Sequence, residues 1–204
     1  MHRLITALIL TCLCTTPTLA ANYTLTIDGK AYDLDLDREA VLRLSEKQEL
    51  RVTLSQKAII NFTTEHISFD HPGNLAPART DLGDGVFQTM LASPRGTLVM
   101  IQEFTTLDPS PFIDLMLSEL TKEELQSGYK VTNSLTTQKL ASGEILSGKL
   151  SVSTSAEDEY TRQVLSYAGK ESGVLVVTQI EAASTAEDKA MIETFWKTLK
   201  VSFE

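Results

Sequence analysis

The sequence of 204 residues contains very little cysteine. Its two cysteines are Cys12 and Cys14, and both lie within the first twenty residues. If that segment is a leader removed after export, the remaining chain has no thiol. Such a chain forms no disulfide, has no thiolate nucleophile and binds no metal through sulfur.

Basic residues are also few. Lysine and arginine number 18 against 27 aspartate and glutamate residues, for a formal net charge of −9, and no Lys/Arg cluster occurs anywhere. Binding to nucleic acid depends on clustered cations that neutralise phosphates and release counterions. The composition therefore predicts a protein with no nucleic-acid partner. At 42% hydrophobic and 22% charged residues, the chain has the composition of an ordinary globular protein.

One apolar segment of about ten residues, Leu4–Leu13, follows the basic residue Arg3 and precedes small residues that end at Ala20. This order is typical of a cleavable signal peptide, and it is about half the length that spans a bilayer. We therefore expect residues 1–20 to be a signal peptide, cleaved after Ala20 or Ala21, and the protein to be periplasmic or secreted.

The alternative for the leader is lipoprotein processing at Cys12. The residue before it is Thr11, not the small residue that usually precedes a lipidated cysteine. Ordinary signal-peptide cleavage is the prediction.

The first part of the predicted mature chain, residues 21–64, is expected to be an N-terminal β extension. Alternating side chains on both sides of Asp28-Gly29 predict a hairpin over residues 23–36, since this dipeptide suits a tight turn. Residues 37–49 are polar and mixed and predict one helical turn. Residues 50–54 and 58–63 predict further strands.

Residues 65–204 are expected to form one α+β domain. Runs with a period of two predict strands, and the short connections between the last four make these antiparallel neighbours. The predicted strands cover residues 65–71, 86–91, 97–104, 131–141, 144–153, 159–168 and 173–182. Glycine and proline turns separate them.

Two helices are predicted in this domain. The first has Ser110 as its N-cap, Pro111 at its first position and an apolar stripe. The stripe consists of Phe112, Leu115, Met116, Leu120 and Leu125. The second helix begins with a capping box formed by Ser184 and Glu187. Its buried face is expected to contain Met191, Ile192, Phe195, Trp196 and Leu199.

This order of elements resembles the PsbP-like (Mog-like) fold superfamily. The resemblance depends on Ile67–Gly73, Leu98–Ile101, the helix Phe112–Leu125, Gly148 in the four-strand meander, and Phe195–Val201. The superfamily includes extrinsic photosystem II proteins, Mog nuclear-import factors and exported bacterial DcrB-related proteins. The resemblance covers about residues 65–203 and implies an antiparallel sheet sandwiched by helices. It also implies a role in binding or assembly, with no enzyme activity.

The only histidines beyond the leader are His66 and His71, on either side of Asp70. In an extended segment His66 and Asp70 share one face, and His71 points to the other. A shared metal site would need a bend at Asp70 and further ligands, because histidine metal sites have several partners. We therefore interpret these residues as polar groups at a strand edge and predict no metal.

The segment Gly143-Glu-Ile-Leu-Ser-Gly148-Lys149 matches most of a phosphate-binding loop. However, Leu150 occupies the place of the Ser or Thr that holds Mg²⁺, and a strand is predicted to follow instead of a helix. No other catalytic motif occurs. These observations predict a protein that is not an enzyme and has no cofactor.

The sequence therefore predicts a non-enzymatic exported binding or assembly protein, whose partner is another envelope protein. The alternative is a periplasmic carrier of an apolar small molecule, with a pocket between the sheet and one helix. A third hypothesis is an enzyme that uses unrecognised carboxylates. The oligomeric state and the identity of the partner are not encoded in any motif.

Overall fold

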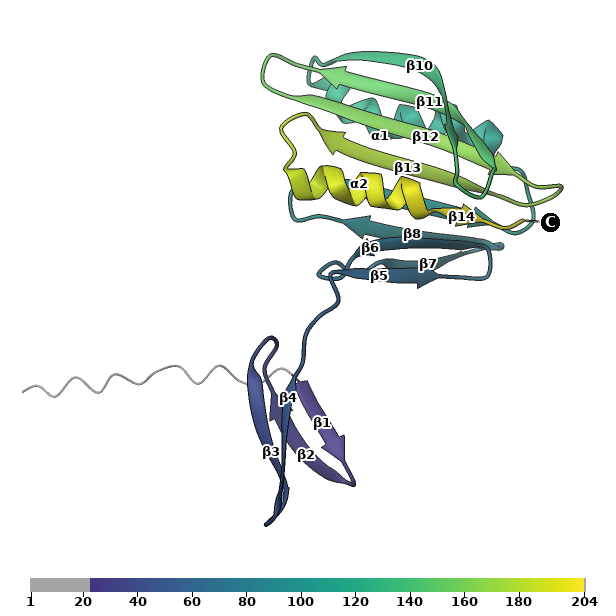
Figure 1. The fold of residues 1–204 in the computed structure, drawn as a ribbon. Helices are drawn as coiled ribbons and strands as arrows, with labels where there is room; N and C mark the ends of the chain where they lie inside the picture. The colour runs from purple at the N-terminus through teal and green to yellow at the C-terminus, as the bar shows by residue number, and fades with distance from the viewer. Residues whose placement is uncertain (1–22, 204) are drawn as a thin grey trace, which may run out of the picture. The chain divides into compact units, whose positions relative to one another are not determined.

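The structure is a computed structural model that describes residues 23–203 (Figure 1). The predicted leader, with Cys12 and Cys14, lies outside these described residues. The chain divides between Gln56 and Lys57 into two compact units, and each is described by itself below.

The first unit consists of two antiparallel hairpins. They are formed by β1 (Tyr23–Ile27) with β2 (Lys30–Leu34), and by β3 (Glu39–Ser45) with β4 (Gln48–Thr53). The predicted hairpin at Asp28-Gly29 is confirmed. Both turn residues have positive φ, 47° and 80°, which is the conformation that a tight two-residue turn requires.

The expectation of a helical turn within residues 37–49 is wrong, because β3 pairs with β4 there. In β3 the inward residues are Ala40, Leu42 and Leu44, which alternate with exposed ones. The exposed face is charged and forms cross-strand ion pairs, such as Arg43 Nε to Glu49 Oε1 at 3.0 Å. The polar and charged residues of this segment therefore form the outer face of a hairpin, which explains its mixed sequence.

The second unit contains a seven-stranded antiparallel sheet in the order β10-β11-β12-β13-β9-β8-β7 (Figure 1). Its strands are β7 (Ala78–Gly83), β8 (Val86–Ala92), β9 (Leu98–Phe104), β10 (Lys130–Lys139), β11 (Ile145–Thr154), β12 (Glu159–Ala168) and β13 (Gly173–Glu181). The predicted antiparallel order of the last four is confirmed. A second sheet, β14-β6-β5, contains β5 (Ile59–Thr63), β6 (Ile67–Pro72) and β14 (Lys200–Val201). The strand β5, within the predicted N-terminal extension, therefore pairs with β6 in this unit.

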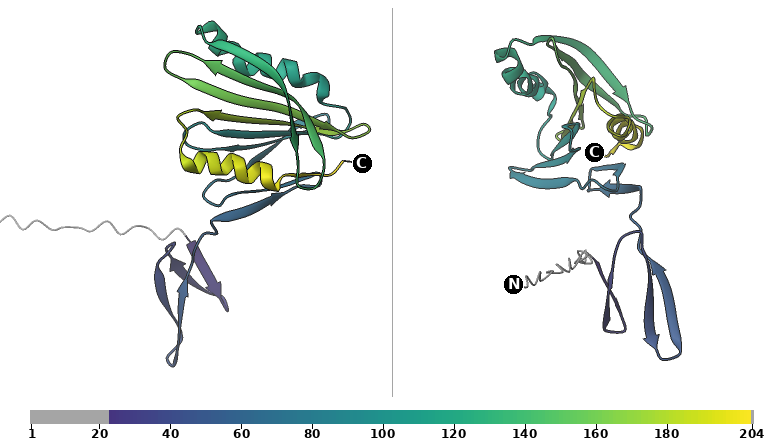
Figure 2. Two further views of the ribbon diagram at one scale, coloured as in Figure 1. Left: turned by 45° about the horizontal axis from the view of Figure 1, so that its top comes forward. Right: turned by 90° about the vertical axis from the view of Figure 1, so that its left-hand side faces the viewer.

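Helices α1 (Ile113–Gln126) and α2 (Ala186–Thr198) lie on opposite faces of the seven-stranded sheet (Figure 2). We call these the α1 face and the α2 face. Successive residues of β13 alternate between them, since Val174 and Val176 pack with α2 while Leu175 and Val177 pack with α1. The α2 face also packs against β6, through Ile67 and Phe69. The predicted α+β class is confirmed.

Helix α2 has the predicted buried face. Met191, Phe195 and Leu199 are buried, and Ile192 and Trp196 pack beside them. The capping box lies one residue later than expected: Thr185 Oγ1 accepts the Asp188 N–H, and the Asp188 carboxylate accepts the Thr185 N–H. Because Ser93 and Thr185 donate hydrogen bonds to this carboxylate, the pKa of Asp188 lies below its ordinary value.

Helix α1 differs more from its prediction. A short 3₁₀ helix, η1 (Ser110–Phe112), precedes it, and no side chain caps it. The prediction of Ser110 as the N-cap is therefore wrong. Leu115 and Leu125 are exposed, whereas Leu117 and Thr121 are buried. The half-buried Glu124 follows on the same face of α1 and pairs with the buried Arg162, so the face that α1 turns to the sheet is not wholly apolar.

Neither helix within residues 23–203 combines the length and the hydropathy of a membrane-spanning segment.

Candidate functional site

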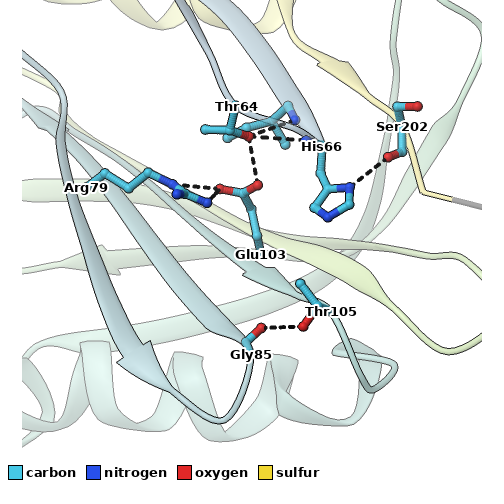
Figure 3. A network of polar contacts seen from close by, with 8 residues as sticks. Thr64, His66, Arg79, Gly85, Glu103, Thr105 and Ser202 are labelled. Atoms are coloured by element: carbon cyan, nitrogen blue, oxygen red, sulfur yellow. Dashed lines mark hydrogen bonds and ion pairs between the residues drawn. The ribbon is translucent and has the colours of Figure 1, made fainter.

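A buried carboxylate, Glu103 on β9, is the centre of a polar network that joins three strands (Figure 3). Its side chain is fully buried. Arg79 on β7 donates to Oε1 through Nε at 3.3 Å and Nη2 at 3.1 Å. Thr64 donates to Oε2 at 2.8 Å. Both carboxylate oxygens therefore have partners, as burial of a charge requires.

Thr64 extends this network into the turn between β5 and β6. Its hydroxyl oxygen accepts hydrogen bonds from the backbone N–H groups of His66, at 3.2 Å, and Ile67, at 3.1 Å. One hydroxyl thus connects the start of β6 to the buried carboxylate on β9. The network fixes the β6 sheet onto the seven-stranded sheet, and we interpret Glu103 as a structural group.

His66 lies beside this network and close to the end of the described chain. Its Nδ1 is 3.3 Å from the carbonyl oxygen of Ser202, and its ring stacks on Phe203 with centroids 4.7 Å apart. A carbonyl only accepts, so this bond requires the proton on Nδ1. The ring borders a cavity of about 590 Å³ that is also lined by Glu65, Thr105 and Ser172.

The three residues considered as weak metal candidates, His66, Asp70 and His71, do not converge. Asp70 accepts a hydrogen bond from Asn61 Nδ2 at 2.8 Å. His71 is buried with Ile67 and Phe69, and its Nδ1 lies 2.9 Å from the carbonyl oxygen of Pro72. The predicted alternation is confirmed, because His71 lies on the buried face of β6. Within residues 23–203 no group of three His, Cys, Asp or Glu side chains could hold a metal ion.

The segment that resembles a phosphate-binding loop, Gly143–Lys149, leads directly into β11, as predicted. Lys149 forms an ion pair with Asp114 of α1. No helix N-terminus follows the segment, so its backbone N–H groups do not form the cradle that binds phosphate in such loops.

A second buried ion pair fixes the end of α1 to the sheet. Arg162 on β12 donates to both carboxylate oxygens of Glu124, with Nη1 to Oε2 at 2.8 Å. Its Nε donates to Gln179 at 2.6 Å. Burial raises the pKa of Glu124, but hydrogen bonds from Arg162 and Ser153 outweigh it, so the pKa lies below its ordinary value.

A groove of about 550 Å³ lies on the α1 face, beside the N-terminus of α1. Its lining consists of Ser110, Ile113, Asp114, Leu135, Thr136, Thr137, Ser147, Gly148, Lys149 and Ser166. Leu135, on the edge strand β10, is 86% exposed. A wall residue that is so exposed means that the groove is open to solvent along β10.

The sequence analysis did not identify Glu103 or the groove. Glu103 is the only charged residue in the strand Leu98–Phe104, which is otherwise apolar except for Gln102. A single charge in such a strand is a signal for a buried, paired group. Its partners Thr64 and Arg79 are 39 and 24 residues away in the chain, so no local pattern points to them.

Comparisons with known proteins add little. No family model and no curated protein sequence matches the chain. Among solved structures, the chain is similar to a crystal structure of a protein from Bacteroides thetaiotaomicron, with a TM-score of 0.34 and 12% identity. That match covers 73% of this chain and 50% of the other, so it spans half the length of the Bacteroides protein.

Proposed function

We propose that this protein is a non-enzymatic binding or assembly protein of the periplasm or cell envelope, and that it acts by binding another envelope protein. The predicted signal peptide supports the compartment. We further propose that residues 65–204 form a PsbP-like domain. The antiparallel sheet with one helix on each face is consistent with that fold.

The observation that carries the proposal is the exposure of Leu135. It is a large apolar side chain, 86% exposed, in the middle of a ten-residue edge strand that has an open groove beside it. In contrast to Leu135, the apolar side chains between the sheet and α2 are enclosed: Leu165, Val174 and Phe195 are fully buried. An exposed apolar side chain on the outer strand of a sheet, whose edge can pair with another chain, supports an interaction site there.

The groove beside β10 argues against the carrier alternative, because a bound small molecule would not be enclosed there. A small-molecule site normally buries most of its ligand, and a wall formed by Leu135 leaves it open to water. The carrier alternative depends on a different feature, within the first unit. There a groove of about 300 Å³ is lined mainly by apolar residues, including Tyr23, Leu25, Leu34, Val52 and Leu54.

Recovery of the full chain from its own host tests the proposal. The chain carries a C-terminal tag and is crosslinked in the intact cell envelope before purification and size-exclusion chromatography. We expect one protein to be recovered with it at a fixed molar ratio. Recovery of the chain alone, with an apolar small molecule detected by native mass spectrometry, would overturn the proposal in favour of the carrier.

A further inference from the structure

The two outer strands of the seven-stranded sheet differ in how open their edges are. β10 pairs with β11 along all ten residues, from Lys130 opposite Thr154 to Lys139 opposite Ile145, with no bulge. Within residues 23–203 no strand pairs with its other side. An outer strand of an antiparallel sheet presents a row of backbone N–H and C=O groups to its surroundings. In β10 this row is long and regular.

The opposite edge, β7, is protected. It is six residues long, carries Arg79 and Asp81, and has an irregular register between Asp81 and Gly83. Short length, charge and a bulge are the usual means by which proteins prevent pairing at an edge. Between Lys130 and Lys139, by contrast, β10 contains no charge, proline or glycine, and four of its eight interior residues are valine or threonine. The sequence of β10 favours pairing.

Besides the backbone edge of β10, side chains on β10 and β11 offer a second surface that a partner could contact. Leu135 and Ile145 lie on the same face of the β10–β11 pair, and both are exposed, at 86% and 55%. The groove next to Leu135 contains hydroxyl groups from Thr137, Ser147 and Ser166. A strand added to β10 places every second side chain on this face.

We propose that β10 is a strand-addition site, where an extended segment of the partner protein extends the sheet as an eighth strand. This proposal rests on the binding function proposed above and names its surface. Lysines stand at both ends of β10, about 30 Å apart at the usual rise of a strand. Lys149, opposite Leu135 at the centre of β10, is already paired with Asp114, so the two terminal lysines set the charge that a partner segment must match. The complementary segment is about ten residues long, uncharged in its centre and acidic at both ends.

A second copy of this chain does not meet these requirements. Full antiparallel pairing of two β10 strands about a two-fold axis places Lys130 of each copy opposite Lys139 of the other. Like charges directly opposite each other destabilise a strand pair. The lysines therefore favour an acidic partner segment over self-association.

A synthetic peptide tests the proposal with the full chain. The probe is a blocked ten-residue peptide with glutamate at both ends and threonine, valine and serine between them. We expect saturable binding in calorimetry and slower hydrogen exchange at the backbone amides of β10. A peptide methylated at all of its central backbone amide nitrogens has no N–H to donate at either edge, so it cannot form the ladder and is expected to show no binding. Equal binding of the methylated peptide would overturn strand addition.

Two matched variants locate the binding edge. Leu135→Lys places a charge in the centre of β10 and is expected to weaken binding at least about tenfold. Leu82→Lys makes the same change on β7, where Leu82 is 52% exposed, and is expected to leave binding unchanged. A peptide with lysine at both ends is expected to bind at least about tenfold more weakly than the glutamate peptide. Equal affinity of Leu135→Lys and the wild type contradicts the assignment to β10.

The experiments distinguish a failure of the strand-addition site from a failure of the proposed binding function. If the host experiment recovers a protein partner but the glutamate peptide does not bind, the strand-addition site is wrong and the binding function stands. If neither experiment shows an interaction, both proposals are wrong. If two copies of the chain associate and Leu135→Lys separates them, the edge pairs with itself, and the acidic partner segment is wrong.

Discussion

The two faces of the seven-stranded sheet are stabilised in different ways. The α2 face is an apolar core in which Phe69, Phe195 and Leu165 are fully buried, and it is closed by both α2 and β6. The α1 face has a smaller apolar cluster, and buried or half-buried polar contacts join α1 to the sheet, chiefly Arg162 to Glu124. This face also keeps an open groove beside β10. The comparison indicates that stability comes mainly from the α2 face, while the α1 face leaves surface for a partner.

The largest expected effect is on the α2 face. Phe195→Ala removes a fully buried ring that contacts Phe69 and Trp196, and it should lower the free energy of unfolding by about 4 kcal/mol. Phe112→Ala on the α1 face removes a half-buried ring stacked on Phe104 and should cost about 2 kcal/mol. Urea unfolding measures both. Equal losses would contradict the stated difference between the faces.

An intermediate effect is expected from the buried ion pair. Glu124→Gln removes the charge that neutralises the Arg162 guanidinium and should cost about 2 kcal/mol at pH 7, with Glu123→Gln, an exposed neighbour, as the control. The pKa of Glu124 is lowered in the folded protein, so its contribution is complete above the ordinary value of 4.5. It is lost as the pH falls below that value.

The stability difference between wild type and Glu124→Gln should therefore shrink as the pH falls below 4.5. Thermal unfolding of both proteins across that range checks it. A difference that stays constant with pH would mean that the carboxylate charge does not hold α1 to the sheet.

The smallest expected change in the free energy of unfolding is for a substitution at the groove beside β10. Asp114 is largely exposed, so Asp114→Asn should change the free energy of unfolding by less than about 0.5 kcal/mol, although it removes the ion pair with Lys149. Because Lys149 lies opposite Leu135 at the centre of β10 and the peptide carries its glutamates at its ends, the affinity for that peptide should change by less than about twofold. Calorimetry with Glu119→Gln as the control measures this. A large loss of stability would show that the Lys149 pair is structural and not part of a binding surface.

Some features of the fold could be predicted from local patterns. The four strands from β10 to β13 are strand-like runs joined by short turns, and the short turns determine their antiparallel order. The buried face of α2 follows from its helical spacing. Other features could not be predicted from local patterns, because they depend on a contact with a residue far away in the chain. The outward charges of Arg43 and Glu49 pair across a hairpin, and Glu124 is half-buried where Arg162 reaches it from β12.

The candidate site shows the same division. The alternation around Asp70 correctly placed His71 on the face of β6 that also holds Ile67 and Phe69, because side-chain direction in a strand is a local property. His66 lies in the turn before β6. The exposure of Leu135 could not be predicted, because an apolar residue in an alternating strand looks the same at an edge and in the interior.

The sequence by itself determined the strand periods, the turns and the position of α2, since these depend on neighbouring residues and on the conformations that each backbone permits. Only the tertiary structure decided that β10 is an outer strand, that Arg79 and Thr64 meet at Glu103, and that α1 leaves a groove uncovered. The physical reason is that sheet order and the pairing of buried charges are set by contacts between segments far apart in the chain, where the gain from burial exceeds local preference.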